Sequence, residues 1–312
     1  MIGFEKNNEM NVISIEGLRK SFNGNIALDG ISMTVRRGDI YGFLGPNGAG
    51  KTTTLRIILG VLKADKGKIS VLNNDLNSWG DKLRYKVNAL PESHGFYGWM
   101  NAVDYLNFFG ELYGMRLTKK DYQLRLSQVR LNPHNNLPVR TFSRGMKQRL
   151  GIARSMVNNP EILFLDEPTN GLDPRGRRDI HDLLVRLNEE NDITIIISTH
   201  ILDDVERLCN RIAILNHGKI RYEGILRSVS NEKNIRYRFL LDHEQTISTD
   251  WKIPGVTFVE IKDDQIICEL KNISPADVIK AFIDSGVKIV EAQKITEGLE
   301  EMYFGYTGGK NQ

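Results

Sequence analysis

Apolar and polar positions follow a strand-like pattern in the first part of the chain. Short apolar or alternating runs, separated by Gly and Asn turns, predict strands over Val12 to Ile15, Ile31 to Val35 and Ile40 to Leu44. An apolar helical run, Thr52 to Leu59, comes directly after a glycine-rich stretch. The opening of the chain is therefore predicted to be mostly strand, with one helix that begins behind a glycine loop.

After Pro138 short apolar runs alternate with amphipathic helical patterns. Short buried strands that alternate with helices are typical of a parallel sheet with helices on both faces. We therefore predict an α/β fold for this part of the chain. The predicted elements are helices over Gly145 to Val157 and Pro174 to Leu187, and strands over Ile162 to Leu165 and Ile193 to Ile197.

Between these two regions the apolar period is that of a helix. Tyr105, Phe109 and Leu112 recur at helical spacing between Asn101 and Arg130. We interpret this stretch as a helical insert, part of a helical subdomain over about residues 94–157.

A polar stretch over residues 226–233 is the predicted boundary between two domains, 1–225 and 234–312. Beyond this linker, alternating runs predict strands, and two short amphipathic runs predict helices. A small α+β domain is therefore expected at the C-terminal end. Its predicted strands are Ile235 to Leu241, Val256 to Ile261, Gln265 to Leu270 and Val287 to Val290, and its predicted helices are Pro275 to Ser285 and Gly298 to Tyr303.

Composition narrows the function classes. The net charge of +3, from 42 Lys and Arg against 39 Asp and Glu, gives no broad positive field, so no nucleic-acid partner is expected. Cys209 and Cys268 lack metal-ligand spacing and are expected to be buried in a reducing compartment. No apolar run approaches the ~20 residues that cross a bilayer, and no secretory signal is recognisable. We expect a cytoplasmic location, with any membrane role exercised through a partner.

The glycine-rich stretch has the pattern G-x-x-x-x-G-K-[ST] between a predicted strand and a predicted helix. Its main-chain N–H groups and the helix start behind them predict a cradle for a polyphosphate. Lys51 is expected to reach the β- and γ-phosphates of ATP, Thr52 to bind Mg²⁺, and Thr53 to bond the α-phosphate. The other candidate residues of the loop are Gly45, Pro46, Asn47, Gly48, Ala49 and Gly50.

Two adjacent acidic residues follow the apolar run Ile162 to Leu165. The C-terminal ends of strands in open α/β sheets carry the ligand chemistry. We expect Asp166 to hold Mg²⁺ through water and Glu167 to act as the general base that activates a water molecule. Taken alone, the loop could be a glycine-rich turn and the acidic pair a solvated strand end; the strand and helix on either side of the loop favour the nucleotide reading.

Residues 12 to 224 resemble the ATP-binding cassette (ABC) family of nucleotide-binding domains. Besides the two motifs above, FSRGMKQRLGIARSM at 142–156 is similar to the family's LSGGQ-type signature, NGLDP at 170–174 to its D-loop, and IIISTH at 195–200 to its switch region. The resemblance implies a P-loop NTPase fold of the ABC type. Such a fold has a mixed sheet core, an antiparallel β subdomain and a helical insert, here with a small C-terminal α+β domain.

The resemblance also implies roles for residues outside the loop. Ser143 and Gly145 would cap the γ-phosphate of ATP bound to the opposite protomer, Asp173 would belong to the D-loop, His200 would contact the γ-phosphate and Phe22 would stack on adenine. Each has a plainer interpretation: Ser143 and Asp173 as helix caps, Phe22 as a core residue and His200 as a strand-end polar group. Their joint order and spacing favour the family roles.

Two positions depart from the family pattern. Glu92 stands where the family's Q-loop usually offers glutamine, and its carboxylate is a candidate Mg²⁺ ligand. Arg144 stands where the signature has its first glycine. Its guanidinium either turns outward or assists the phosphate of the opposite protomer, and we favour the outward position.

The family resemblance implies partners. A separate transmembrane permease subunit would dock on the helical insert, where Phe96, Tyr97 and Trp99 lie in a predicted loop, and a second nucleotide-binding subunit would complete a dimer. The expected function is the ATP-hydrolysing subunit of a membrane transporter, an exporter in type, held at the cytoplasmic face of the membrane by the permease. The alternatives are a soluble ABC ATPase that acts on ribosomes or DNA, and an inactive ATP-sensing subunit.

Overall fold

The computed structural model describes residues 11–78, 85–93, 95–226, 235–242, 253–262, 264–271, 273–295 and 299–308. The chain forms two compact units, one reaching to Leu226 and the other covering Arg227–Phe304. From Gly305 onward the chain belongs to the first unit, although the sequence had placed this stretch in the second domain. Asn216 Nδ2 donates to the carbonyl of Tyr306 at 3.0 Å, and the rings of Tyr222 and Tyr306 lie 5.9 Å apart. Of the predicted linker, only Leu226 lies within the described residues.

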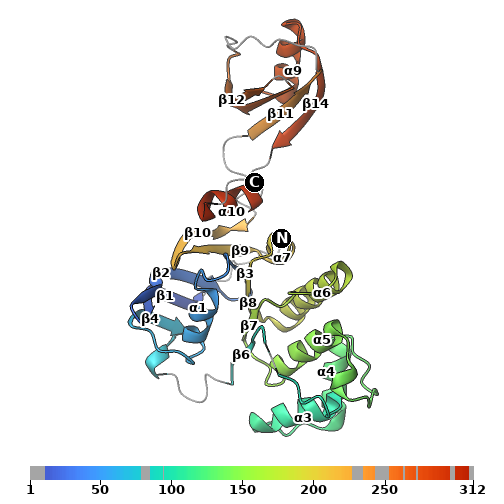
Figure 1. The fold of residues 1–312 in the computed structure, drawn as a ribbon. Helices are drawn as coiled ribbons and strands as arrows, with labels where there is room; N and C mark the ends of the chain where they lie inside the picture. Colours follow the sequence, from blue (N-terminus) through green and yellow to red (C-terminus); the bar gives the residue numbers. More distant parts are fainter. Residues whose placement is uncertain are drawn as a thin grey trace, which may run out of the picture. The chain divides into compact units, whose positions relative to one another are not determined.

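The first unit is built around a six-stranded sheet (Figure 1). Five of its strands pair in parallel and β10 pairs antiparallel with β9, which confirms the predicted α/β class. Every residue of β3, β8 and β9 is buried, because apolar runs of this kind have helices or another sheet on both faces. The strand order is β10 (Lys219–Ile225), β9 (Arg211–Asn216), β3 (Ile40–Leu44), β8 (Thr194–Thr199), β7 (Ile162–Asp166) and β6 (Val87–Leu90).

A second, antiparallel sheet of the first unit has the order β2-β1-β4-β5. One apolar core joins its buried side chains to helix α1 (Lys51–Ile58) and to β3, so the helix behind the glycine loop is fixed from two sides. The strands are β1 (Asn11–Phe22), β2 (Asn25–Arg36), β4 (Lys66–Val71) and β5 (Asn74–Asp75), and a 3₁₀ turn, η1 (Leu76–Ser78), follows them.

Helices α3 (Ala102–Leu112), α4 (Lys119–Gln128) and α5 (Arg144–Ser155) pack on one another as the helical insert (Figure 1). Tyr105 is fully buried, whereas Leu112, at the same helical spacing, is 65% exposed. A capping box at Thr118 and Asp121 begins α4 by satisfying two free N–H groups of its first turn. The remaining elements of the unit are η2 (Val139–Thr141), α6 (Pro174–Asn191) and α7 (Leu202–Leu208).

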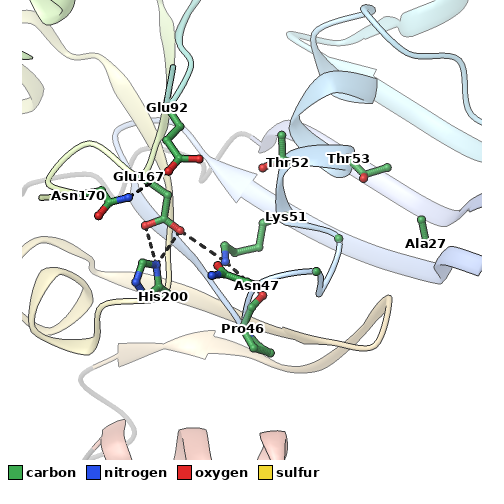
Figure 2. Close-up of a pocket in the computed structure, with 12 residues that line it drawn as sticks. Ala27, Pro46, Asn47, Lys51, Thr52, Thr53, Glu92, Glu167, Asn170 and His200 are labelled. Atoms are coloured by element: carbon green, nitrogen blue, oxygen red, sulfur yellow. Dashed lines mark hydrogen bonds and ion pairs between the residues drawn. The ribbon is translucent and has the colours of Figure 1, made fainter. Parts of the chain in front are cut away.

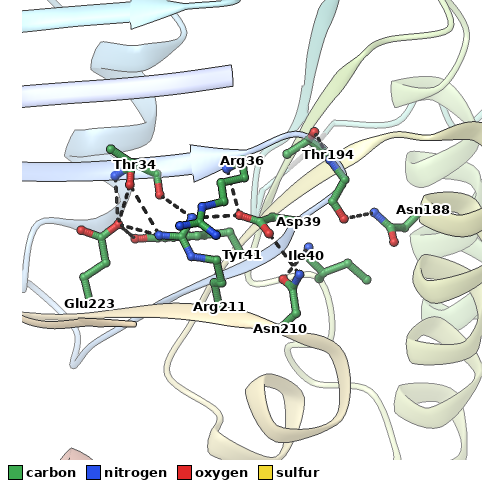
Figure 3. A network of polar contacts seen from close by, with 11 residues as sticks. Thr34, Arg36, Asp39, Ile40, Tyr41, Asn188, Thr194, Asn210, Arg211 and Glu223 are labelled. Carbon is green, nitrogen blue, oxygen red and sulfur yellow. Dashed lines mark hydrogen bonds and ion pairs between the residues drawn. The ribbon is translucent and has the colours of Figure 1, made fainter. Parts of the chain in front are cut away.

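A buried polar network ties the two sheets of the first unit together (Figure 3). Arg211 on β9 pairs with Asp39 at 3.1 Å and Glu223 at 3.6 Å, and donates to the carbonyl of Thr34 on β2 at 3.1 Å. The hydroxyl of Tyr41 donates to Glu223 at 3.0 Å, and burial together with this carboxylate raises the pKa of Tyr41. Removing one partner of a buried pair typically costs about 3–5 kcal/mol, so this network fixes the sheet that carries the glycine loop.

The second unit is a four-stranded antiparallel sheet in the order β12-β13-β11-β14, with helix α9 (Pro275–Asp284) packed on it. Phe239, Cys268 and Phe282 are fully buried in its core. The strands are β11 (Ile235–Leu241), β12 (Val256–Lys262), β13 (Gln265–Leu270) and β14 (Ile289–Ile295), and helix α10 (Leu299–Thr307) follows them. The last strand begins later than predicted because Val287 still closes α9, with its N–H bonded to the carbonyl of Phe282 at 2.9 Å.

Both cysteines are free and buried, as predicted. Cys209 lies behind β3, where its sulfur is 2.9 Å from the place a Cβ on Gly42 would take. Burial raises the pKa of both thiols, that of Cys268 to about 12. In the part of the chain that the structure describes, no helix is both long and apolar enough to span a bilayer.

Candidate functional site

A pocket of about 300 Å³ opens at the C-terminal ends of β3, β7 and β8 (Figure 2). It brings together residues from segments that lie far apart in the sequence, including the glycine loop, the acidic pair and the switch histidine. Ten of its lining residues were predicted from the sequence, and Ala27 and Asn170 were not. The lining residues are Ala27, Pro46, Asn47, Gly48, Gly50, Lys51, Thr52, Thr53, Glu92, Glu167, Asn170 and His200.

Two glycines of the loop are required by close packing, and one of them by its backbone conformation as well. Gly50 has φ 112°, and a Cβ there would lie 2.6 Å from Leu28 Cδ2 and 2.9 Å from the carbonyl of Ala27. A Cβ on Gly45 would collide with the carbonyl of Leu215. Gly50 also begins α1 with no side-chain cap, so the first N–H groups of the helix remain available to an anion at the pocket.

Lys51 lies buried in the loop, with its side chain only 6% exposed. Its ammonium donates to the carbonyl of Gly45 at 2.6 Å and lies 3.5 Å from Glu167 Oε1. The buried charge is thus paired and hydrogen-bonded, which burial of an ammonium group requires. The ammonium of Lys51 therefore lies at the centre of the loop, with the carboxylate of Glu167 as its counter-ion.

Glu167 and His200 form the second half of this centre. Both carboxylate oxygens of Glu167 lie 3.0 Å from His200 Nδ1, so the ring is oriented by the carboxylate (Figure 2). Glu167 has φ 49°, a left-handed conformation that is uncommon outside glycine, and its N–H donates to the carbonyl of Ser198 at 2.9 Å. Backbone strain of this kind is concentrated at functional sites.

Thr52 and Asp166, the two residues expected at Mg²⁺, lie side by side at the end of the loop. The Thr52 hydroxyl donates to Asp166 Oδ2 at 3.1 Å, and the Ser198 hydroxyl donates to Asp166 Oδ1. Hydroxyl and carboxylate oxygens are the donors that Mg²⁺ takes from proteins, usually few of them and with water in the remaining positions. Thr52 and Glu92 line this pocket, and together with Asp166, which is bonded to Thr52, they line the one beside it, so these three oxygen ligands fit a magnesium ion.

Glu92 is held by a residue that the sequence analysis did not single out. Asn170 Nδ2 donates to Glu92 Oε1 at 3.0 Å, across a separation of 78 residues. The signal for Asn170 was its place at the head of NGLDP, a stretch from which only Asp173 had been chosen. The contact links the loop after β6 to the loop after β7.

Of the predicted residues beyond the glycine loop and the acidic pair, four do not line this pocket. Phe22 is 44% exposed at the end of β1, with Lys20 Nζ 5.4 Å from its ring centre. Ser143 and Asp173 are N-caps of α5 and α6 and accept hydrogen bonds from Met146 and Gly176, each at 3.2 Å. Gly145, the fourth of these residues, lies in the first turn of α5.

Arg144 lies against its own chain. Its guanidinium occupies the place that a Cβ on Gly171 would take, and Gly171 has φ 68°. The side chain is exposed, in agreement with the outward position that the sequence analysis favoured. Arg144 therefore connects the start of α5 to the loop that precedes α6.

The fold and the site define a P-loop nucleoside triphosphatase of the ABC type, because the glycine loop lies between β3 and α1 and faces the acidic end of β7. A family model described as ABC transporter matches residues 28–170. Curated relatives of 30% identity or more also extend over nearly the whole chain. The chain belongs to the ABC transporter ATP-binding proteins.

Three relatives illustrate the match. The bacitracin transport ATP-binding protein BcrA of Bacillus licheniformis is 32% identical over 96% of this chain and 98% of its own length. The Nod factor export ATP-binding protein I of Ralstonia nicotianae is 37% identical over 68% of this chain and 67% of its own. A dimeric ATP-binding cassette solved in a post-hydrolysis state with ADP and Pi superposes with a TM-score of 0.62 at 26% identity, covering 69% of this chain and 99% of that one.

Proposed function

We propose that this chain is the ATP-hydrolysing subunit of a membrane exporter and works as a dimer at the cytoplasmic face of the membrane, bound to a separate permease. The observation that carries the proposal is the pairing of Lys51 and His200 with the two oxygens of Glu167 in one pocket. The relatives named above are transport proteins, which supports transport and gives no support to an action on ribosomes or DNA.

ATP binding follows from the loop geometry. The free N–H groups at the start of α1 and the ammonium of Lys51 face the pocket and would take the β- and γ-phosphates, while Thr53 bonds the α-phosphate. Phe22 is exposed and available to stack on adenine. Thr52, Asp166 and Glu92 would hold Mg²⁺, which neutralises charge on the phosphates.

Hydrolysis follows from the same contacts. Once phosphate oxygens take over the ammonium of Lys51, the carboxylate of Glu167 loses its counter-ion and is free to accept a proton from water. His200 Nδ1 lies 3.0 Å from that carboxylate and keeps it oriented. The water would then attack the γ-phosphorus as the bond from that phosphorus to the β,γ-bridging oxygen breaks and ADP leaves, while Glu167 holds the proton from the water.

A second subunit would complete each site. Ser143 is exposed at the start of α5, outside the pocket of its own chain, as expected for a residue that serves the ATP of a partner. The dimeric state of the cassette with ADP and Pi supports this arrangement. Because ATP would contact both subunits only in the closed dimer, binding would favour closure and hydrolysis would reopen it.

The docking surface for the permease would be the aromatic loop before α3. Trp99 is 69% exposed and Tyr97 is 44% exposed, with the Tyr97 ring 5.1 Å from that of Phe108 on α3. Phe96 packs on Tyr105 at 5.4 Å and therefore also serves the subdomain core. Exposed aromatic side chains on a rigid helical support are typical of a partner surface.

The test of nucleotide binding is calorimetry on the full chain. Mg·ATP titrated into the wild type should give a saturable heat, and Lys51→Ala should abolish it, whereas Lys63→Ala, at an exposed lysine, should leave it unchanged. A folded wild type that gives no heat would overturn the proposal.

The docking surface is tested by release of the subunit from the membrane complex. Release is expected for Trp99→Ser and not for Leu124→Ser, a change at another exposed apolar side chain.

A further inference from the structure

Behind the pocket lies a buried polar group that the proposed reaction does not use. His181 on α6 and Asp204 on α7 are joined by a contact of 2.7 Å between His181 Nε2 and Asp204 Oδ1. The other oxygen of Asp204 accepts a hydrogen bond from the hydroxyl of Thr169 and a longer one, 3.5 Å, from that of Thr199. All four residues are at least 96% buried.

The two threonines are placed next to the residues proposed to act in hydrolysis. Thr169 comes two positions after Glu167, and Thr199 comes directly before His200. The carbonyl of Thr199 also accepts the N–H of Gly45, the first residue of the glycine loop, at 3.4 Å. One carboxylate, that of Asp204, thus fixes the two segments that hold the Glu167–His200 pair.

His181 helps to stabilise the buried carboxylate of Asp204. An ionised carboxylate removed from water needs several donors, and Asp204 receives them from His181, Thr169 and Thr199. His181 Nδ1 has no partner among the described residues, so Nε2, which faces Asp204, is the ring nitrogen through which His181 acts. The neighbouring Asp203 is exposed and paired with Arg207 at 2.6 Å, so it does not compete for the histidine.

We propose that Asp204 and His181 are positioning residues for ATP hydrolysis. They hold Thr169 and Thr199 in place and thereby keep Glu167, in its left-handed conformation, directed at His200. The inference rests on the proposed function, because it concerns the hydrolytic step. It requires no contact between Asp204 or His181 and the nucleotide.

The kinetic experiment uses the full chain and matched variants. Thr169→Val removes the hydroxyl at nearly constant volume, and His181→Leu removes the ring donor; both should lower kcat roughly tenfold or more, with KM for ATP changed less than about twofold. Thr169→Ser keeps the hydroxyl, and the Gln side chain of His181→Gln keeps a donor, so these variants should retain most of the rate. The thermal midpoint of each variant separates loss of turnover from loss of folded protein.

A second measurement needs no turnover. The ring signal of His200 in the isotope-labelled full chain, assigned by its loss in His200→Ala, should move in Thr169→Val at constant pH and stay in place in Thr169→Ser. In a double-mutant cycle, Thr169→Val should add little to the loss caused by His200→Ala.

The outcomes separate the two proposals. A wild type that does not hydrolyse ATP overturns the proposed function. A wild type that does hydrolyse, together with a Thr169→Val variant of equal kcat and an unmoved His200 signal, overturns the positioning role of Asp204 and His181. Full additivity of Thr169→Val with His200→Ala overturns it as well.

Discussion

The residues assigned to ATP fall into an inner group and an outer group that differ in burial and in bonding. Lys51 and Glu167 of the inner group are buried and bonded to one another, and His200 joins them. Ser143 and Phe22 of the outer group are exposed: Ser143 accepts a hydrogen bond from the Met146 N–H, and Phe22 lies beside Lys20. The inner group is therefore held by contacts within one chain, whereas the outer residues remain exposed to a ligand or to a second subunit.

The largest effect is expected inside the inner group. Glu167→Gln removes the proposed base and should lower kcat by roughly 10²- to 10⁴-fold, the usual contribution of a general base. ATP binding should persist, because the phosphates are held by the glycine loop, and the closed dimer should accumulate on size-exclusion chromatography with ATP. Rapid turnover by this variant would contradict the assignment.

The next effect concerns Lys51. Lys51→Ala would remove the two charge-assisted hydrogen bonds proposed to the phosphates, each worth about 1.5–3 kcal/mol, and should weaken ATP binding by about 10³-fold, enough to abolish the heat of the titration. Calorimetry with Mg·ATP checks the affinity. A variant that binds ATP as tightly as the wild type would remove Lys51 from the inner group.

The role of Ser143 across subunits is tested by mixing two variant chains. Ser143→Ala should lower kcat about tenfold by loss of a hydrogen bond to a charged phosphate, with ATP binding to the single chain unchanged. Mixed with Lys51→Ala chains, it should form heterodimers in which one composite site is intact. The mixture should then hydrolyse ATP faster than the mean of the two separate variants; a rate equal to that mean would show that the groups do not act across subunits.

Phe22 belongs to the outer group by exposure but would touch the base of its own chain's nucleotide. Phe22→Ala should weaken ATP binding about tenfold, because stacking on a base is worth about 1–3 kcal/mol. Binding of inorganic tripolyphosphate, measured by competition, should not change. Ile26→Ala, at a neighbouring exposed side chain, is the control.

The smallest effect is expected at Arg144. Its guanidinium rests on Gly171 of its own chain and is exposed, so Arg144→Gly should change kcat less than about twofold, as is usual for surface substitutions. A large fall in kcat would instead show that this side chain assists the phosphate of the partner.

The glycine loop was predictable from the sequence because its residues form one contiguous motif between a strand and a helix. The contact of Asn170 with Glu92 was not predictable, because it joins loops that only the parallel pairing of β6 and β7 brings together. His181 and Asp204 gave no signal either: neither belongs to a recognised motif, and only the packing of α6 and α7 buries them.

The C-terminal elements were predicted in order but not in extent. Alternating runs predicted all four strands of the second unit, because one face of its sheet packs on α9. The return of the chain to the first unit from Gly305 had no local signal, since it depends on the contacts of Tyr306 with Asn216 and Tyr222. Interactions between distant segments decide such boundaries.

The burial of both thiols has a practical consequence for studies of the closed dimer. Alkylating and spin-labelling reagents react with the thiolate, and Cys209 and Cys268 are both inaccessible and protonated at neutral pH. The native chain therefore serves as its own unreactive background. A cysteine introduced at the exposed position of Leu124, outside the proposed site, would be the sole labelling site, and distances across the proposed dimer could be followed through the nucleotide cycle without altering the core.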